Sequence, residues 1–391
     1  MEQNALIRRG VGLKGVDHNK VSPGYVVYAH LTSTGTVRVV DNNGNEVHSW
    51  NLPLRPGRHA RILPDGSLAY NGVHPEGPDL FTMWQKYRGG VMIKVSPAGK
   101  ILSEYRDPYA HHDQHHLDNG ELIYTTVEPL TSAAAATISG GIPGSEAPNN
   151  IVYGDCIKHV DPSTGELLWY WRAIDHLDPQ KFKLNPHFDR EHWPLINSVT
   201  VLKDGNILAS LRSVSAVVVI SRETGDILLH IDDNIVAQQH CASELDNGNI
   251  LIFDNGTHRK NSSATFSRVI EVSRSTGEVV WSYVDKSMPM SFFSAFMGGA
   301  QRLRNGNTLI TEAMFGRVFE VTQNGDVVWE YVNPHFANYA EFKDGGENLG
   351  KVGFDYPANA IFRAYKYTPD EIPWIGSLDG GEGMVTPAST P

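Results

Sequence analysis

The chain of 391 residues is poor in cysteine and in long apolar segments. Its two cysteines, Cys156 and Cys241, are too few for a disulfide framework, and we expect both to be buried free thiols. No run approaches the ~18 apolar residues of a membrane-spanning helix, and residues 1–15 lack the apolar stretch of a signal peptide. We therefore expect a cytoplasmic protein without a membrane partner, or a periplasmic one if a signal segment has been removed.

Basic residues are also in deficit, because the formal net charge is −11. Binding to phosphate backbones needs a basic surface, so this balance argues against a nucleic-acid partner. An anionic small molecule would need a local cluster of histidine and arginine to offset the overall negative charge. The chain contains 17 histidines, which are enough to build such a cluster.

Glycine is abundant, and it marks a repeated hairpin. The segments TVRVVDNNGNEVHSW, VMIKVSPAGKILSEY, RVIEVSRSTGEVVWSY and RVFEVTQNGDVVWEY each contain two short strands joined at a Gly turn. Six such hairpins recur at roughly 50 to 65 residues, a period typical of propellers and other arrays. Between them lie hairpins of a second type, such as HARILPDGSLAY and ASELDNGNILIF, whose Asp-Gly and Asn-Gly turns are strong hairpin signals.

Two hairpins per period make four strands, which is the content of a propeller blade. We label these strands A to D from the channel outward. The chain begins with strands of type B and C and ends with NAIFRAYKYT, a lone strand of type A. The sequence therefore predicts an all-β protein, a six-bladed β-propeller closed by strands from both termini. We expect an N-terminal extension at 1–23, the propeller at 24–368 and a C-terminal tail at 369–391, whose segment GSLDGGEGMVTPASTP we expect to be flexible.

Long connections fall between strands B and C or between D and the next A, whereas A–B and C–D connections are tight turns. Examples of long connections are 128–150, 173–195, 284–297 and 332–356. In an up-and-down blade both kinds of long connection emerge on one face. Because long loops in compact domains are usually functional, we expect the site at that end of the channel.

Polar residues stand just ahead of the A–B turns in several blades, where innermost strands would converge on the axis. These residues are His59, His112, Asp113, Asn197 and His240. Arg212 ends a strand of type B and so points to the same face. We assign the neighbouring His111 to a loop. The convergent set predicts a site built from residues distant in sequence.

The chain resembles the bacterial aryl sulfotransferases along nearly its whole length. The segments that carry the resemblance include HHD at 111–113, WPLINSV at 193–199, ILASLRSVSAVVVI at 207–220 and QHCASELDNGNILIFDNG at 239–256. Members of this family are six-bladed propellers that move a sulfuryl group from one phenol to another without adenylyl sulfate. The resemblance implies an aromatic, anionic small-molecule substrate and no cofactor.

The resemblance also assigns roles. His240 corresponds to the histidine that attacks sulfur and becomes sulfated, as suits a neutral imidazole. Arg212 corresponds to an arginine that binds the oxygens of the transferring group. His112 corresponds to a histidine that protonates the leaving phenolate or holds an oxygen, and Asp113 is expected to fix its tautomer.

One departure from the family pattern keeps alternatives open. The family carries a histidine where this chain has Leu195, and His192 lies three residues upstream as a substitute. A second hypothesis is therefore a hydrolase or lyase in which His59, His112 and His240 act as acid and base or bind a divalent metal. A third is a binding propeller without chemistry. The oligomeric state is left open, with a homodimer as one alternative.

Overall fold

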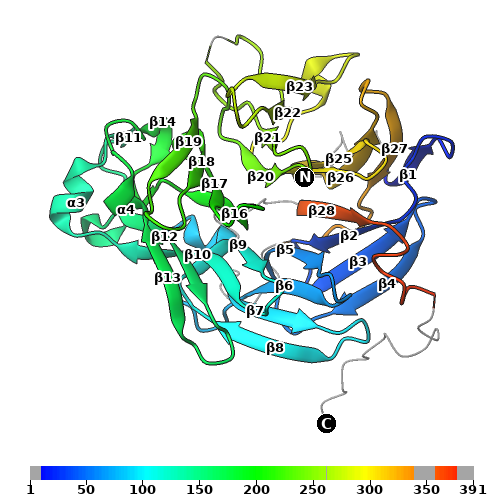
Figure 1. The fold of residues 1–391 in the computed structure, drawn as a ribbon, viewed down its shortest axis with the longest axis horizontal. Helices are drawn as coiled ribbons and strands as arrows, with labels where there is room; N and C mark the ends of the chain where they lie inside the picture. Colours follow the sequence, from blue (N-terminus) through cyan, green and yellow to red (C-terminus); the bar gives the residue numbers. More distant parts are fainter. Residues whose placement is uncertain (1–9, 261, 339–356, 377–391) are drawn as a thin grey trace.

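Six antiparallel sheets surround a central channel in the computed structural model, which describes residues 10–260, 262–338 and 357–376 (Figure 1). The expected tail beyond residue 376 and most of the expected loop 332–356 lie outside these residues. Each sheet is one blade of four consecutive strands, with one exception at the closure. The prediction of a six-bladed propeller is confirmed.

The four strands of a blade are ordered from the channel outward. Blade 1 contains β28 (Ile361–Tyr367), β2 (Tyr25–His30), β3 (Thr36–Asp41) and β4 (Glu46–Asn51). Blade 2 contains β5 (Pro56–Ile62), β6 (Leu68–Val73), β7 (Gly90–Val95) and β8 (Ile101–Arg106). Blade 3 contains β9 (Ala110–His116), β10 (Leu122–Pro129), β12 (Tyr153–Val160) and β13 (Leu167–Arg172).

The remaining blades follow the same order. Blade 4 contains β16 (Ile196–Val201), β17 (Ile207–Leu211), β18 (Ala216–Ile220) and β19 (Ile227–Ile231). Blade 5 contains β20 (His240–Glu244), β21 (Ile250–Asp254), β22 (Arg268–Val272) and β23 (Val279–Tyr283). Blade 6 contains β24 (Gly299–Arg302), β25 (Thr308–Glu312), β26 (Arg317–Val321) and β27 (Val327–Val332).

Both termini take part in closing the ring, as the strand count predicts. The C-terminal β28 pairs antiparallel with β2, with Tyr367 opposite Tyr25. A buried ion pair of 2.8 Å between Lys366 and Glu320 ties β28 to blade 6. In addition, β1 (Gly12–Val16) pairs with β27 as a fifth strand of blade 6, a pairing that the sequence did not indicate.

Tryptophans on the outermost strands join neighbouring blades through a repeated hydrogen bond. The indole N–H of Trp50 donates to the carbonyl of Ser96 in the C–D turn of the next blade, at 3.0 Å. The indole of Trp329 makes the equivalent bond to Asn42 at 2.9 Å, across the closure of the ring. The aromatic residues that end these hairpins therefore fasten one blade to the next, in addition to filling space between them.

The connections at residues 128–150 and 173–195 lie beside blades 3 and 4 (Figure 1). They contain α3 (Ser132–Thr137), α4 (Ala173–His176), β14 (Leu184–Asp189) and β15 (His192–Trp193), the last of which pairs with β12. The connection between β6 and β7 contains α2 (Trp84–Tyr87). A parallel pair of β14 and β11 (Gly140–Ile142) links the connections at 128–150 and 173–195. No helix in the described part of the chain is long and apolar enough to cross a bilayer.

Candidate active site

A cavity of about 240 Å³ lies where the long connections meet the innermost strands. Its wall includes His112, Arg212 and His240, so the structure brings together the three residues expected to carry the chemistry. Aromatic and apolar side chains form much of the remaining wall: Met83, Tyr87, Phe188, Leu195, Phe296, Met297 and Phe362. The cavity therefore combines polar groups with surfaces that suit an aromatic ring.

Local backbone geometry aims the two central histidines. His112 has φ 43°, and Cys241, which follows His240, has φ 51°, both in the left-handed region. Each lies where the pairing of its innermost strand shifts, by two residues in β9 and by one residue in β20. Such bulges bend a strand and redirect a side chain. Non-glycine residues in this region store strain, which is common at functional sites.

The hydrogen bonds of His240 define its tautomer. Nδ1 lies 2.8 Å from Oδ1 of Asn255, whose Nδ2 donates to the carbonyls of Ser294 and Met297. The Asn255 oxygen is therefore an acceptor, and Nδ1 of His240 carries the proton. Nε2 accepts a hydrogen bond of 3.1 Å from the backbone N–H of Met297. Burial, and then the charge of Arg212, hold the pKa of His240 well below 6.5, so the ring is neutral at pH 7 with a lone pair on Nε2.

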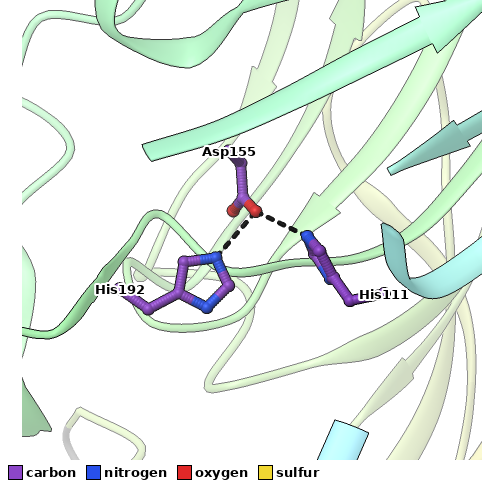
Figure 2. Close-up of side chains that lie close together, drawn as sticks. All are labelled: His111, Asp155 and His192. Carbon is purple, nitrogen blue, oxygen red and sulfur yellow. Dashed lines mark hydrogen bonds and ion pairs between the residues drawn. The ribbon is translucent and has the colours of Figure 1, made fainter. Parts of the chain in front are cut away.

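His112 ends a chain of contacts that runs behind the cavity wall. Its Nδ1 lies 2.8 Å from Nδ1 of His111, and Nε2 of His111 lies 2.9 Å from Oδ1 of Asp155. The same carboxylate oxygen lies 2.7 Å from Nε2 of His192 (Figure 2). Nδ1 of His192 lies 2.9 Å from the hydroxyl of Tyr87, which returns to the cavity wall. One buried carboxylate thus serves two arms that both end at the cavity.

The charge states of the residues in this series of contacts follow from their burial. Burial alone would raise the pKa of Asp155, but His192 and His111 lower it to about 2, so the carboxylate is ionised. Burial lowers the pKa of His111, and burial together with His111 lowers that of His112 well below 6.5. Burial, followed by Glu191, raises the pKa of Tyr87, so its hydroxyl keeps its proton. At neutral pH both His111 and His112 are therefore neutral.

Three cations line the cavity within an acidic protein: Arg58, Lys86 and Arg212. Arg212 lies over the ring of Phe188 at 4.7 Å, and burial lowers its pKa to about 10. Lys86 lies over the ring of Phe296 at 4.4 Å, and burial, together with Arg58, lowers its pKa to about 8. All three are charged at neutral pH, which makes the cavity a site for an anionic group.

Two acids, Asp189 and Glu191, also line the cavity. Burial, followed by the charge of Asp189, raises the pKa of Glu191 to about 7. Because Glu191 is only partly ionised at neutral pH, the three cations exceed the negative charge around them.

Asp113, expected to fix the tautomer of His112, is placed elsewhere. It lines a second cavity on the far side of His112, where Oδ2 accepts from Arg363 at 3.2 Å and from the backbone of Val199 at 3.0 Å. The nitrogen that faces Nδ1 of His112 comes from His111 instead. His111 itself lies in β9 rather than in the loop to which the sequence assigned it.

Asn197 and His192 support the wall more than they face substrate. Nδ2 of Asn197 donates to the carbonyl of Gln239, next to His240, at 2.8 Å. His192 reaches the cavity, but Asp155 and Tyr87 engage its two nitrogens. Leu195, at φ 63°, contributes an apolar side chain to the same cavity wall. Tyr87 also lines the cavity, and sequence reasoning missed it.

The alternative metal set of His59, His112 and His240 stays a prediction, because the side chain of His59 lies outside the described structure. Within the described residues, donor atoms within 4.8 Å of one another come from His111, Asp155 and His192. Their direct separations of 2.7 and 2.9 Å are those of N–H groups in contact with a carboxylate. We therefore describe these three as a histidine–carboxylate cluster, in which His192 is hydrogen-bonded to Asp155 and His111 lies in close polar contact with it.

Sequence reasoning also missed Lys86, Asp155 and Asn255. Lys86 comes from α2, in a connection that carried no motif, whereas Asn255 follows directly on strand β21 in the FDNG segment. Arg58 adjoins the predicted His59, and its position ahead of an A–B turn was a usable signal.

Comparison with solved structures indicates the fold. A protein of unknown function from Bacteroides caccae superposes with a TM-score of 0.51 at 13% identity, covering 88% of this chain and 99% of that one. Virginiamycin B lyase from Staphylococcus aureus, in a catalytically inactive form with quinupristin, gives a TM-score of 0.45 at 12% identity, over 84% of this chain and 91% of that one. No curated protein sequence matches the chain.

The family is identified from the sequence. The pattern described as Arylsulfotransferase (ASST) matches residues 17–349, which contain blades 2 to 6, the three outer strands of blade 1 and every residue of the cavity wall except Phe362. The chain therefore belongs to the arylsulfotransferase family.

Proposed function

We propose that this protein transfers a sulfuryl group from an aryl sulfate to a phenolic acceptor through a sulfohistidine at His240. The observation that carries the proposal is the state of His240, a neutral ring whose protonated Nδ1 is held by Asn255. Its Nε2 lone pair lies in the wall of a cavity that contains three cations. A neutral imidazole beside an electropositive pocket is the arrangement that nucleophilic attack on an anionic sulfate ester requires.

In the first half-reaction, Nε2 of His240 attacks sulfur and the aryl oxygen leaves with the electron pair of the S–O bond. Arg212 and Arg58 neutralise the sulfuryl oxygens as the bonds change. Phe188, Phe296 and Phe362 offer faces for the aryl ring. In the second half-reaction a phenol gives its proton to His112, and its oxygen attacks the same sulfur. The S–N bond then breaks, and its electron pair returns to Nε2 of His240.

A second candidate, a hydrolase or lyase on the same propeller, has one observation in its favour. Leu195 places an apolar side chain in the cavity wall at a position where the resembled family carries a histidine. With one cationic donor fewer, the site is less suited to a sulfuryl transition state. In this candidate His112 and His240 act as acid and base or bind a divalent metal together with His59.

Rapid-quench mass spectrometry with p-nitrophenyl sulfate, in the presence and absence of phenol, tests the first candidate. We expect a sulfuryl adduct on the peptide that contains His240, its loss on addition of phenol, and no turnover by His240→Ala. His230→Ala, which changes an exposed histidine on β19 outside the cavity, is the control and should retain activity. Turnover by the wild type with an unmodified His240 peptide, together with an active His240→Ala, would show that the sulfohistidine is wrong.

Two further measurements distinguish the second candidate, a hydrolase or lyase, from the proposed sulfotransferase. A sulfotransferase yields phenyl sulfate in proportion to the phenol consumed, whereas a hydrolase yields free sulfate at a rate that phenol does not change. Metal analysis of the purified wild type and of His112→Ala tests the metal alternative, since a ligand's removal should release a bound ion.

A further inference from the structure

The cluster behind the cavity wall has an arrangement that fixes where its protons lie. Asp155 is wholly buried in β12, and its Oδ2 accepts a hydrogen bond of 2.7 Å from the backbone of Ile196. Its Oδ1 is shared between His111 and His192 (Figure 2). A ring nitrogen this close to an ionised carboxylate carries a proton, because a lone pair there would be repelled. Nε2 of each histidine is therefore an N–H group.

The first arm decides the tautomer of His112. A neutral His111 that carries its proton on Nε2 has only a lone pair on Nδ1. Nδ1 of His112, at 2.8 Å, must then be the donor of that contact. In a neutral His112 with a protonated Nδ1, Nε2 holds the lone pair. Asp155 thus makes Nε2 of His112 a proton acceptor without touching it.

The second arm acts in the same way on Tyr87. When the ring of His192 carries one proton, on the Nε2 that faces Asp155, its Nδ1 accepts and the Tyr87 hydroxyl donates to it at 2.9 Å. The lone pairs of the Tyr87 oxygen then remain for other partners. The Tyr87 ring also lies against His112, with ring centroids 4.5 Å apart and an interplanar angle of 32°. The two arms therefore converge on neighbouring groups in the cavity wall.

We infer that Asp155 is a positioning residue that holds His112 as the proton acceptor for the incoming phenol, with Tyr87 as the packed neighbour that fixes its ring. This inference rests on the proposed function and adds the residues that prepare its second half-reaction. In that step the phenolic proton moves to Nε2 of His112 while the phenolic oxygen bonds to sulfur. The S–N bond to His240 breaks, and His112, now an imidazolium, later returns the proton to a leaving phenolate or to water.

Asp155→Asn is the direct test. An amide cannot accept from both histidines and from Ile196, and its NH₂ group turns a facing ring nitrogen into an acceptor. If that ring is His111, its Nδ1 becomes the donor and Nε2 of His112 then carries the proton, so His112 can no longer accept one. We expect transfer from the sulfoenzyme to phenol to fall by about 10² to 10⁴-fold, the range of lost general-base catalysis and of a wrong tautomer.

The two half-reactions separate positioning from general damage. Sulfation by p-nitrophenyl sulfate releases a stable phenolate and needs no proton, so its rate should stay within about threefold of wild type. In Asp155→Asn the decrease in the rate of the second half-reaction should become smaller as the acceptor phenol becomes more acidic. Glu320→Gln, which removes an equally buried carboxylate from its pair with Lys366, is the matched control. It should lower stability without a selective loss in either half-reaction.

His111→Gln covers the case in which Asp155→Asn does not fold. Glutamine can still reach Asp155 but offers no partner to Nδ1 of His112, so the same selective loss is expected. Equal losses in both half-reactions, or wild-type rates in both variants, would overturn the inference. So would one equivalent of a divalent metal in the wild type that Asp155→Asn lacks. If the wild type forms no sulfoenzyme at all, the proposed function fails first, and the two failures are distinguishable.

Discussion

The backbone N–H of Met297 donates a hydrogen bond of 3.1 Å to Nε2 of His240. Asn255 binds both ends of this contact, because Oδ1 accepts from Nδ1 of His240 and Nδ2 donates to the carbonyl of Met297. Met297 is held at φ 61°, in the left-handed region. The one lone pair of Nε2 thus accepts this N–H group. In the proposed mechanism this N–H group must turn away from Nε2 before the lone pair can attack sulfur.

Asn255 should accordingly control the reactivity of His240. Asn255→Ala removes the acceptor for Nδ1 and releases Met297, and we expect sulfation of His240 to slow by about 10- to 100-fold. Asn255→Asp keeps the acceptor and adds a charge, which should raise the pKa of His240. Asn359→Ala removes a wholly buried amide that binds Asn333 instead, and it is the control. Single-turnover rates of sulfation test this prediction. Equal rates in Asn255→Ala and Asn359→Ala would contradict the role of Asn255 in controlling His240.

The activity should fall at a lower pH than it would if His240 had the pKa of an ordinary histidine. In the proposed mechanism the neutral form of His240 is the nucleophile, and burial, followed by the charge of Arg212, lowers its pKa well below 6.5. The sulfation rate should therefore stay level as the pH falls through 6.5 and decline only below that value. In Asn255→Asp the decline should begin at higher pH. A wild-type profile that loses half its rate at pH 6.5 or above would contradict the burial of this ring.

Raising the pH above 7 should change KM rather than kcat. Above about pH 7 Glu191 gains its negative charge, and above about pH 8 Lys86 loses its positive charge. Both changes weaken the attraction of an anionic aryl sulfate, so KM should rise by about tenfold or less between these pH values and 9. Lys86→Arg keeps its charge and should abolish the upper part of the rise. Glu191→Gln should abolish the lower part.

The fold was predictable because its signals are local. Asp-Gly and Asn-Gly turns fix each A–B hairpin within about ten residues, and the lone A strand of β28 follows from counting hairpins. The pairing of β1 with β27 was not predictable, since GLKGV has no alternation and no turn to set its partner. His112, Arg212 and His240 were predictable because innermost strands of a ring converge on one axis.

The support of the site was not predictable, because it depends on contacts between distant segments. Asp155 lies in a third strand, 44 residues from His111 in the sequence, and the segment between them gives no sign of the contact. Asp113 was misjudged for a physical reason. The irregular backbone at His112 turns Asp113 into the second cavity, where Arg363 and the backbone of Val199 bind its carboxylate.

Arg212 should act on the rate of transfer. Its guanidinium lies in the cavity wall over Phe188, within reach of Gln238 at 3.4 Å. Arg212→Ala removes one charged donor to the sulfuryl oxygens, and we expect kcat to fall by about 10² to 10³-fold. Arg222→Ala removes an arginine that stacks on Trp169 outside the cavity and should change kcat little. A rise in KM at constant kcat would instead assign Arg212 to ground-state binding.

Leu195 decides between a sulfotransferase and a site rebuilt for another reaction. Its side chain lines the cavity at φ 63°, a conformation that histidine and asparagine tolerate better than leucine. Leu195→His adds a donor to the wall beside Tyr87, and in a sulfotransferase it should raise the rate of sulfation. Leu195→Asn is the control, because it shares the backbone preference but cannot become cationic.

The two variants at Leu195 separate the effect of charge from the relief of backbone strain. If both raise the rate equally, relief of strain explains the gain and the donor does not matter. If only Leu195→His raises it, and more at pH 6 than at pH 8, a protonated imidazole supplies the stabilisation of the transition state. A rate of sulfation that neither variant increases, with release of free sulfate or of a non-sulfated product unchanged, would favour a hydrolase or lyase, since a site adapted to another reaction gains nothing from a further cationic donor.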